Sequence, residues 1–141
     1  MNWKDYYREK TVTADQAARM VKSGDRLVAG HATASPETLL EALVANSNHL
    51  EDVEIVHMVS MGKSLYCRPE HHKAFRHNSL FAGSATRALI AQGKADYTPC
   101  FFKDIPGLFK NGMLPVDVAM ITVSPPDKSG NVSLGVSVDY T

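Results

Sequence analysis

The sequence predicts an α/β protein in which helices flank an open, mainly parallel β-sheet. Short apolar segments alternate along the chain with segments whose apolar residues recur at helical spacing. Glycines follow several of the helical segments, as is common at helix ends. With 141 residues, 44% of them hydrophobic and 21% charged, the chain is long enough for one globular domain with an ordinary core.

The first clear helix and strand lie between residues 13 and 29. Thr13-Ala14-Asp15-Gln16 is a capping-box pattern, in which the threonine side chain caps the helix and the glutamine side chain reaches back. Gly24 is placed to end that helix. Arg26–Ala29 follows directly, and its short, apolar, glycine-bounded composition predicts a buried strand.

A second helix and strand follow in the same order. Ser35 as the N-cap and Pro36 at the first helical position predict a helix start. The apolar stripe of this helix consists of Leu39, Leu40, Leu43 and Val44. The segment Val53–Val59 is then predicted to be a second buried strand.

Two further helices and another strand are predicted in the second half of the chain. Ser84 caps a short helix that ends at Gly93, and another helix starts at Asp104. Val116–Val123 is almost wholly apolar, as a central strand should be.

The last predicted strand, Val132–Val138, differs from the others because its apolar residues alternate with small ones. The segment 124–131 before it contains two prolines, an aspartate and a glycine, which define a turn, so this last pair of strands could run antiparallel. Asp139-Tyr140-Thr141 follows without a helix to cover the sheet. We expect the chain to continue beyond this point, although by pattern alone a small domain that ends in a strand fits equally well.

Composition and charge limit the classes of function. Fifteen basic residues balance fifteen acidic ones, so we expect neither a nucleic-acid nor a membrane partner. No apolar run approaches the roughly 20 residues that span a bilayer, and the N-terminus lacks the apolar core of a signal peptide. Cys67 and Cys100 lie far apart, which favours reduced thiols and a cytoplasmic location.

His31 is the strongest candidate for a functional residue. It follows the strand Arg26–Ala29, and the next helix begins about five residues later, as in a short βα loop. Open α/β sheets bind ligands at the carboxyl ends of their strands, where a neutral imidazole can donate a hydrogen bond to a carboxylate or thioester oxygen. A histidine that only caps a strand end is the alternative interpretation.

Weaker candidates follow the later strands. Side chains alternate along a strand, so only one of His57 and Met58 can face the ligand side, and methionine is most often a core residue. Gly62 and Lys63 could approach an anionic group closely. The helix start at Ser84-Ala85-Thr86-Arg87 could bind an anion, although most such caps only satisfy their own helix.

No strong catalytic or metal-binding motif is present. The sequence has no glycine-rich phosphate loop, no Gly-x-Ser-x-Gly elbow and no His-Glu-x-x-His pattern. Cys67, His71, His72 and His77 suggest a metal site, but the adjacent histidines would point to different sides of a helix. We therefore expect no metal.

Five groups of segments, in their order and spacing, point to one family. They are Ser23–Arg26, Gly30-His31 with Ser35-Pro36, His57–Val59 with Gly62-Lys63, Val116–Val118 leading into Val123–Asp127 and Gly130, and Gly135–Thr141. Together they resemble the acetyl-CoA hydrolase/transferase family, and within it the 4-hydroxybutyrate and acetate CoA-transferases. Members of that family are about three times this length, beyond one ordinary domain, so the resemblance is to their N-terminal part.

The resemblance implies a CoA-transferase-like α/β fold made of two related halves, with the active site between them. In this family a glutamate attacks the acyl-CoA thioester and carries CoA as a glutamyl thioester in a ping-pong reaction. That glutamate and a glycine-rich CoA loop belong to the second half, so no residue here is assigned a catalytic role. Residues 1–141 are therefore expected to be inactive alone. Coenzyme A is a substrate, no cofactor is expected to be bound covalently, and the residues that contact CoA stay unknown.

The resemblance also implies partners and site residues. The partners are acyl-CoA, small carboxylic acids and the C-terminal half of the same protein, and we expect a homo-oligomer. His31 is predicted to line the pocket for the acyl or carboxylate group and Met58 to shape its apolar part. The Pro125-Pro126-Asp127 turn is predicted to be a rigid element near the interface between the halves. The alternative is a self-sufficient, non-catalytic domain of the same ancestry that binds a small ligand or regulates.

Overall fold

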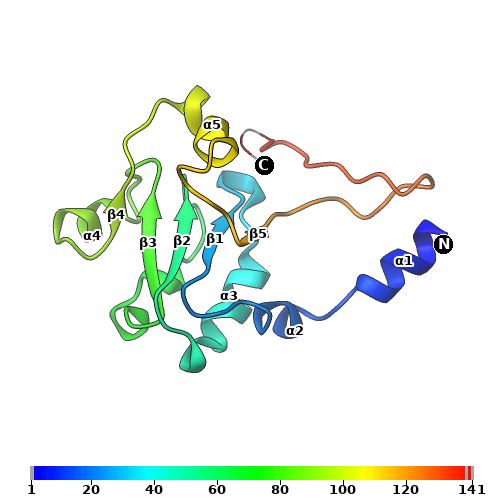
Figure 1. The fold of residues 1–141 in the computed structure, drawn as a ribbon, viewed down its shortest axis with the longest axis horizontal. Coiled ribbons are helices and arrows are strands. Elements are labelled where there is room, and N and C mark those ends of the chain that lie inside the picture. The colour runs from blue at the N-terminus through cyan, green and yellow to red at the C-terminus, as the bar shows by residue number, and fades with distance from the viewer. Residues whose placement is uncertain (1, 139, 141) are drawn as a thin grey trace.

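The structure, a computed structural model, describes residues 2–138 and Tyr140. Its centre is a five-stranded sheet with the order β4-β3-β2-β1-β5, in which all neighbouring strands are parallel. The strands are β1 (Arg26–Ala29), β2 (Val53–His57), β3 (Phe75–Ser79), β4 (Asp96–Tyr97) and β5 (Val118–Met120). Their carboxyl ends lie together at the top of the molecule (Figure 1). The predicted open, parallel α/β sheet is therefore confirmed.

Helices lie on both faces of this sheet. The helices of the described chain are α1 (Trp3–Lys10), α2 (Ala14–Ala18), α3 (Glu37–Ala45), α4 (Arg87–Ala91) and α5 (Ile105–Lys110). Helix α1 is the exception, because it has no buried residue and lies apart from the sheet (Figure 1). Residues of α2 and α3 share one buried cluster with the sheet, and residues of α5 share the other. No helix in the described part of the chain is long and apolar enough to cross a bilayer.

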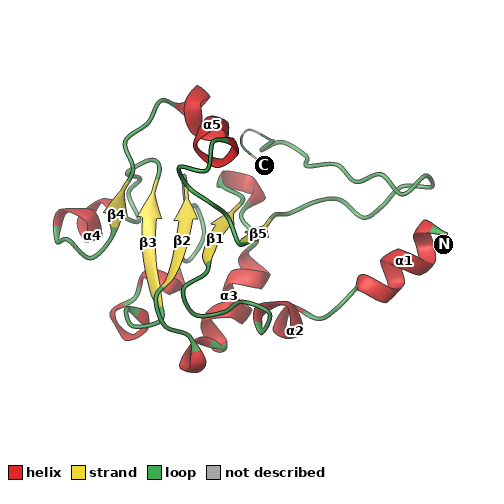
Figure 2. Cartoon of the chain, viewed as in Figure 1, coloured by secondary structure: helices red, strands yellow, loops and turns green. Residues whose placement is uncertain are grey.

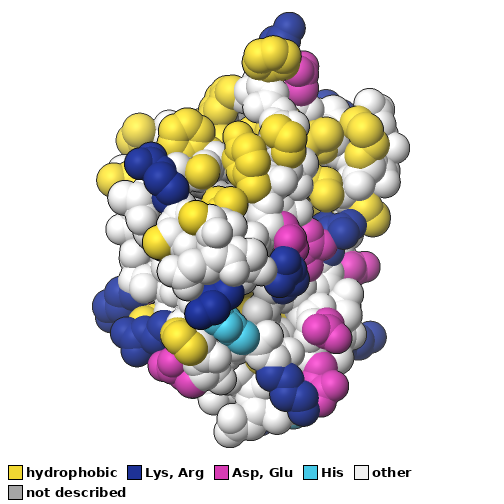
Figure 3. Space-filling view, turned by 90° about the vertical axis from the view of Figure 1, so that its left-hand side faces the viewer, with side chains coloured by type: hydrophobic (Ala, Val, Ile, Leu, Met, Phe, Trp, Pro, Cys, Tyr) yellow, Lys and Arg dark blue, Asp and Glu magenta, His cyan; other side chains and the backbone are white. Residues whose placement is uncertain are grey.

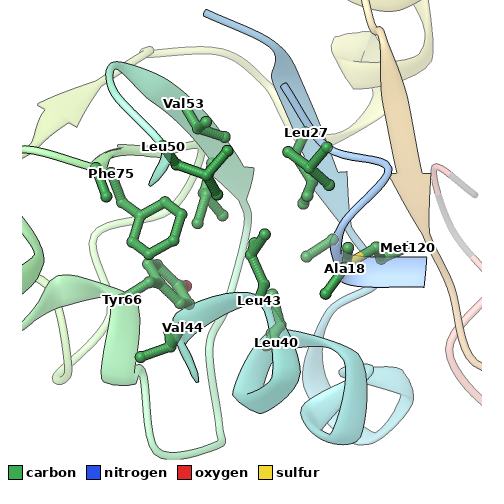
Figure 4. Close-up of a cluster of buried hydrophobic side chains, with 14 of the residues drawn as sticks. Ala18, Leu27, Leu40, Leu43, Val44, Leu50, Val53, Tyr66, Phe75 and Met120 are labelled. Carbon is green, nitrogen blue, oxygen red and sulfur yellow. The ribbon is translucent and has the colours of Figure 1, made fainter. Parts of the chain in front are cut away.

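Alternation of side chains along the strands produces these two clusters. In β1, Leu27 and Ala29 face the α2 and α3 side, whereas Val28 faces α5. The larger cluster packs apolar side chains from β1, β2, β3 and β5 against α3 and against Tyr66 (Figure 4). Burial of this apolar surface is the main favourable contribution to the stability of the fold.

Two of the four predicted helix starts are confirmed, at Thr13 and at Asp104, which is the N-cap of α5, and two are displaced. Thr13 forms the capping box of α2, with its Oγ1 accepting from the Gln16 amide at 3.2 Å. Ser35 does not cap α3, because its hydroxyl donates to the Glu37 carboxylate and Pro36 occupies the N-cap position. Ser84 does not cap α4 either, because the chain turns at residues 83–86 and the helix starts at Arg87.

The C-terminal arm, residues 121–138, contradicts the prediction of a final strand. Val132–Val138 is irregular and the preceding strand is only β5, at the edge of the sheet (Figure 2). A half-buried strand needs a neighbour for its backbone groups, whereas this stretch pairs with no strand of the described sheet. The Ser124 amide donates to its Ser133 carbonyl at 2.9 Å. Asp139 and Thr141 belong to Gly135–Thr141, one of the segments on which the family resemblance depends, and both lie outside the described residues.

The proline-rich turn of the arm has the defined conformation that the sequence predicts. One carboxylate oxygen of Asp127 accepts from the amides of Ser129 at 2.8 Å and Asn131 at 2.9 Å. These hydrogen bonds lower the pKa of the Asp127 carboxyl. Gly130, with φ of +89°, closes the turn, and the ring of Trp3 from α1 lies so close that a β-carbon on Gly130 would be 3.0 Å from it. Helix α1 thus contacts the tip of the arm.

Candidate functional site

The loops that follow β1 and β2 meet at the carboxyl edge of the sheet. The Ala32 amide donates to the Val59 carbonyl at 3.0 Å, and the Gly30 amide donates to the Met120 carbonyl of the neighbouring strand end at 2.9 Å. A β-carbon on Gly30 would lie 2.9 Å from the Ala34 carbonyl oxygen, so only glycine fits there. This tight turn places His31 directly above the end of β1, where the sequence predicts it.

Aromatic rings enclose His31. The Tyr140 ring stacks on the imidazole, with centroids 5.4 Å apart and planes 20° apart, and Phe102 contacts its edge at 6.5 Å. The Tyr140 hydroxyl donates to the Ala29 carbonyl at 2.5 Å, which anchors this cover to β1. Only 8% of the His31 surface is exposed. His31 therefore sits in a largely apolar environment in which a hydrogen bond to a ligand would be strong.

A row of buried polar side chains lies under this edge, on the α3 side of the sheet. His57 is fully buried, and its Nδ1 is hydrogen-bonded to the Tyr66 hydroxyl at 2.9 Å. Burial lowers the pKa of His57 to about 3, with His77 and His31 acting in the same direction and the Gly30 backbone opposing. Burial also raises the pKa of Tyr66. Both groups are therefore neutral near pH 7.

The row continues to His77 in β3. Its ring centroid lies 5.6 Å from that of Tyr66, and burial lowers the pKa of His77 to about 4 despite opposing contributions from the Ile55 backbone and Asp96. Sequence reasoning missed this row because Phe75–Ser79 has no apolar run that would predict a strand. An aromatic residue soon after a strand end is too common a signal to have identified Tyr66.

Met58 lies on the opposite face from His57, as alternation requires. It is 6% exposed and belongs to the cluster beneath α5, which consists of Val28, Val56, Met58, Leu80, Ile105 and Leu114. Tyr140 packs against the same cluster and also stacks on His31. Tyr140 thus links the cluster that contains Met58 to His31, and the contact of Met58 with a substrate stays a prediction.

Gly62 approaches an anionic group closely, and that group is the carboxylate of Glu37 in this same chain. A β-carbon on Gly62 would lie 1.9 Å from Glu37 Oε1. The Lys63 amide donates to Glu37 Oε2 at 3.2 Å, and Lys63 Nζ pairs with Glu41 at 2.7 Å. The Gly-Lys pair therefore contacts internal carboxylates of α3.

The other candidates do not converge on one site. His71 Nδ1 lies 3.3 Å from Ser47 Oγ, and His72 Nε2 lies 3.2 Å from the Cys67 carbonyl. Among the described residues, no three or more histidine, cysteine, aspartate or glutamate side chains could together hold a metal ion. Burial raises the pKa of Cys67 to about 12, so the thiol is protonated. Arg87, predicted as an anion ligand, donates to the Ala82 carbonyl at 3.3 Å.

Comparison with known proteins agrees with this architecture. The model of the acetyl-CoA hydrolase/transferase N-terminal domain matches residues 1–141. The 4-hydroxybutyrate coenzyme A transferase of Clostridium kluyveri is 50% identical over 141 residues, which are 100% of this chain and 33% of that protein.

Two solved structures have the same fold. The crystal structure of RipA from Yersinia pestis matches with a TM-score of 0.90 and 30% identity, covering 99% of this chain and 35% of that one. The 4-hydroxybutyrate CoA-transferase of Porphyromonas gingivalis matches with a TM-score of 0.81 and 31% identity, covering 99% of this chain and 31% of that one. The chain thus spans about a third of the length of the relatives it matches.

Proposed function

The chain belongs to the acetyl-CoA hydrolase/transferase family, and from this membership we propose that the full-length protein is an acyl-CoA:carboxylate CoA-transferase of the 4-hydroxybutyrate or acetate/butyrate type. The observation that carries the proposal is 50% identity, over all 141 residues, to a 4-hydroxybutyrate coenzyme A transferase. The proposed substrates are an acyl-CoA and a small carboxylic acid, and coenzyme A passes from one acid to the other.

The proposed reaction runs through a glutamate in the part of the protein beyond these residues. Its carboxylate attacks the thioester carbonyl, forms a mixed anhydride and releases the CoA thiolate. The thiolate then attacks the glutamyl carbonyl, which gives a glutamyl-CoA thioester and frees the first acid. The second acid reverses these steps. Thioesters are exchanged throughout, so no oxidant, reductant or covalently bound cofactor is required.

We propose that this chain supplies the second wall of the active site. His31 is proposed to donate a hydrogen bond to the acyl or carboxylate oxygen, because it lies at the carboxyl edge of the sheet where such folds bind ligands. Met58 is proposed to shape the apolar part of the pocket, since it belongs to the buried cluster against which Tyr140 packs, and the Tyr140 ring stacks on His31. The turn at Pro125-Pro126-Asp127 is proposed to lie near the interface with the rest of the protein.

The direct test is a steady-state assay of the purified full-length protein with butyryl-CoA or 4-hydroxybutyryl-CoA and acetate. We expect acetyl-CoA to form, and residues 1–141 alone to give no turnover above a boiled control. Incubation with acyl-CoA but no acceptor should raise the intact mass by that of CoA less one water. Acetate-independent hydrolysis would indicate a hydrolase, and ligand binding without turnover would indicate the non-catalytic alternative.

We also propose that the protein acts in the cytoplasm as a homo-oligomer. The cytoplasmic proposal follows from the composition, with its two distant cysteines and balanced charge. Sedimentation of the full-length protein measures its oligomeric state.

A further inference from the structure

Residues 58–65 form a compact loop that is closed at its base and braced inside. The hydrogen bond between His57 Nδ1 and the Tyr66 hydroxyl, 2.9 Å long, joins the two residues that flank the loop. Inside the loop, Ser60 Oγ and Ser64 Oγ lie 2.6 Å apart. Ser64 has a φ of 45°, in the left-handed region that is costly for residues other than glycine. This conformation persists only where the surroundings hold it.

The same loop is tied to the one that carries His31. The Ala32 amide donates to the Val59 carbonyl at 3.0 Å, and Ala32 also lies in the left-handed region, with a φ of 52°. Each of the two loops after β1 and β2 thus contains one strained residue. A movement of loop 58–65 would therefore move the backbone next to His31.

The carboxylate of Glu37 supports this pair of loops from α3. Its Oε1 accepts from Ser35 Oγ at 2.6 Å and its Oε2 accepts from the Lys63 amide at 3.2 Å, so both oxygens are used. The Gly62 backbone lies so close to the Glu37 carboxylate that there is no room for a β-carbon at residue 62. An amide in place of the carboxylate has one oxygen for the Lys63 amide, its NH2 group can meet the Ser35 hydroxyl only as a donor, and both hydrogen bonds lose the negative charge that strengthens them.

We propose that Glu37 is a positioning residue of the active site: its carboxylate holds loop 58–65 and, through the Ala32–Val59 hydrogen bond, fixes where His31 meets the substrate. The inference rests on the proposed function. Glu37 itself contacts no reacting atom. It acts by keeping two strained loops in one geometry, and misplacement of a substrate-contacting group by about 1 Å can cost a hundredfold in rate.

The experiment compares Glu37→Gln, Glu37→Asp and Glu41→Gln in the full-length protein. Glu41 is the matched control, because it lies on the same helix and its carboxylate pairs with the Lys63 side chain, whereas the Glu37 carboxylate accepts from the Lys63 amide. We expect Glu37→Gln to lower kcat by about ten- to a hundredfold with a smaller change in KM. Glu37→Asp, which keeps two oxygens, should recover part of the loss. Glu41→Gln should be close to wild type.

Hydrogen exchange of the same variants provides a measurement that does not depend on activity. The amides of Ala32 and Lys63 should exchange faster in Glu37→Gln than in the wild type. In Glu41→Gln they should exchange at the wild-type rate. Faster exchange with unchanged kinetics, or unchanged exchange, would overturn the proposal. If the wild type transfers no CoA, the proposed function fails, while exchange still reports whether Glu37 holds the loops.

A second variant, Gly62→Ala, displaces the Glu37 carboxylate from the side of the loop. It should have the same effect on kcat and on amide exchange as Glu37→Gln. If both variants unfold, Glu37 is structural and the proposal is wrong.

Discussion

The paired loops after β1 and β2 differ sharply from the C-terminal arm at residues 121–138. The loops are tied by side-chain hydrogen bonds of Glu37, Tyr66 and Ser64, and His31 between them is 8% exposed. The arm has a well-satisfied turn at its tip, but its apolar side chains face outward, and Val136 is 91% exposed. Within the described chain, side-chain hydrogen bonds hold the loops in place, whereas the arm leaves apolar side chains such as Val136 exposed.

The difference indicates which surface the rest of the protein covers. Contiguous apolar patches are small on monomers, and larger ones usually mark an interface. Apolar side chains also gather over the upper half of another face, near the carboxyl ends of the strands, whereas charged side chains occupy its lower half (Figure 3). Large exposed apolar residues on the segments that follow β2, β3 and β4 include Met61, Phe81, Phe101 and Phe102. We therefore expect the remainder of the protein to dock on the carboxyl-end side and against the arm.

The largest expected effect is on kcat/KM, and it tests whether the loops after β1 and β2 contribute to activity. In the full-length protein, His31→Ala should lower kcat/KM by about a hundredfold or more, because a lost donor to a developing charge costs about 2.7–4 kcal/mol. We expect the melting temperature to change little. Measuring kinetics and melting on one variant decides the matter: unchanged kcat/KM with a lower melting temperature would mean that His31 only packs against Tyr140.

The buried histidines beneath the loops predict a smaller, pH-dependent effect. The pKa values of His57 and His77 in the folded chain, about 3 and about 4, lie below the usual value of about 6.5. Below pH 6.5 the unfolded state therefore binds more protons, so their contribution to stability is complete above that pH and decreases as the pH falls toward 4. Each histidine contributes a slope of up to about 1.4 kcal/mol per pH unit.

Denaturant unfolding of the full-length protein at pH 7, 6, 5 and 4.5 measures this slope. His57→Gln should flatten it, although the variant is less stable at pH 7 because the Tyr66 hydroxyl loses its partner. His49→Gln is the control, since His49 is exposed and should leave the slope unchanged. An equal slope in wild type and His57→Gln would show that His57 is not held neutral in the folded state.

The sequence predicted the parts of the fold that depend on local pattern. Apolar runs identified β1 and β2, and the capping box of Thr13 identified α2. Strand β3 was not predicted, because its buried polar residues have their hydrogen-bond partners far along the chain. Asn78 Nδ2 donates to Glu54 at 2.7 Å, its Oδ1 accepts from the Thr98 hydroxyl at 2.9 Å, and no periodicity could reveal these pairings.

The candidate site also has one part that a local pattern predicts and another that depends on contacts between distant residues. His31 was located correctly because a strand, a glycine and a helix start are all local signals. The contacts that hold it were not predictable: Tyr66 bonds to His57, and Glu37 bonds to the Lys63 amide 26 residues away. The strand predicted at Val132–Val138 is wrong for the opposite reason. Its alternating pattern is typical of a strand with one buried face, and the described chain offers no surface that buries this face.

The smallest effect within this chain gives the clearest test of the arm. Val136→Asp places a charge on a side chain that is 91% exposed, so residues 1–141 alone should lose less than about 0.5 kcal/mol of stability. In the full-length protein the same side chain is expected to be buried against the remainder, where an unpaired charge is costly. The melting temperature should then fall by several degrees. Lys128→Asp, which changes charge in the turn of the same arm without removing an apolar side chain, should affect neither protein. If Val136→Asp has equally little effect on both, the arm is solvent-exposed in the complete protein, and its alternating pattern does not mark the interface.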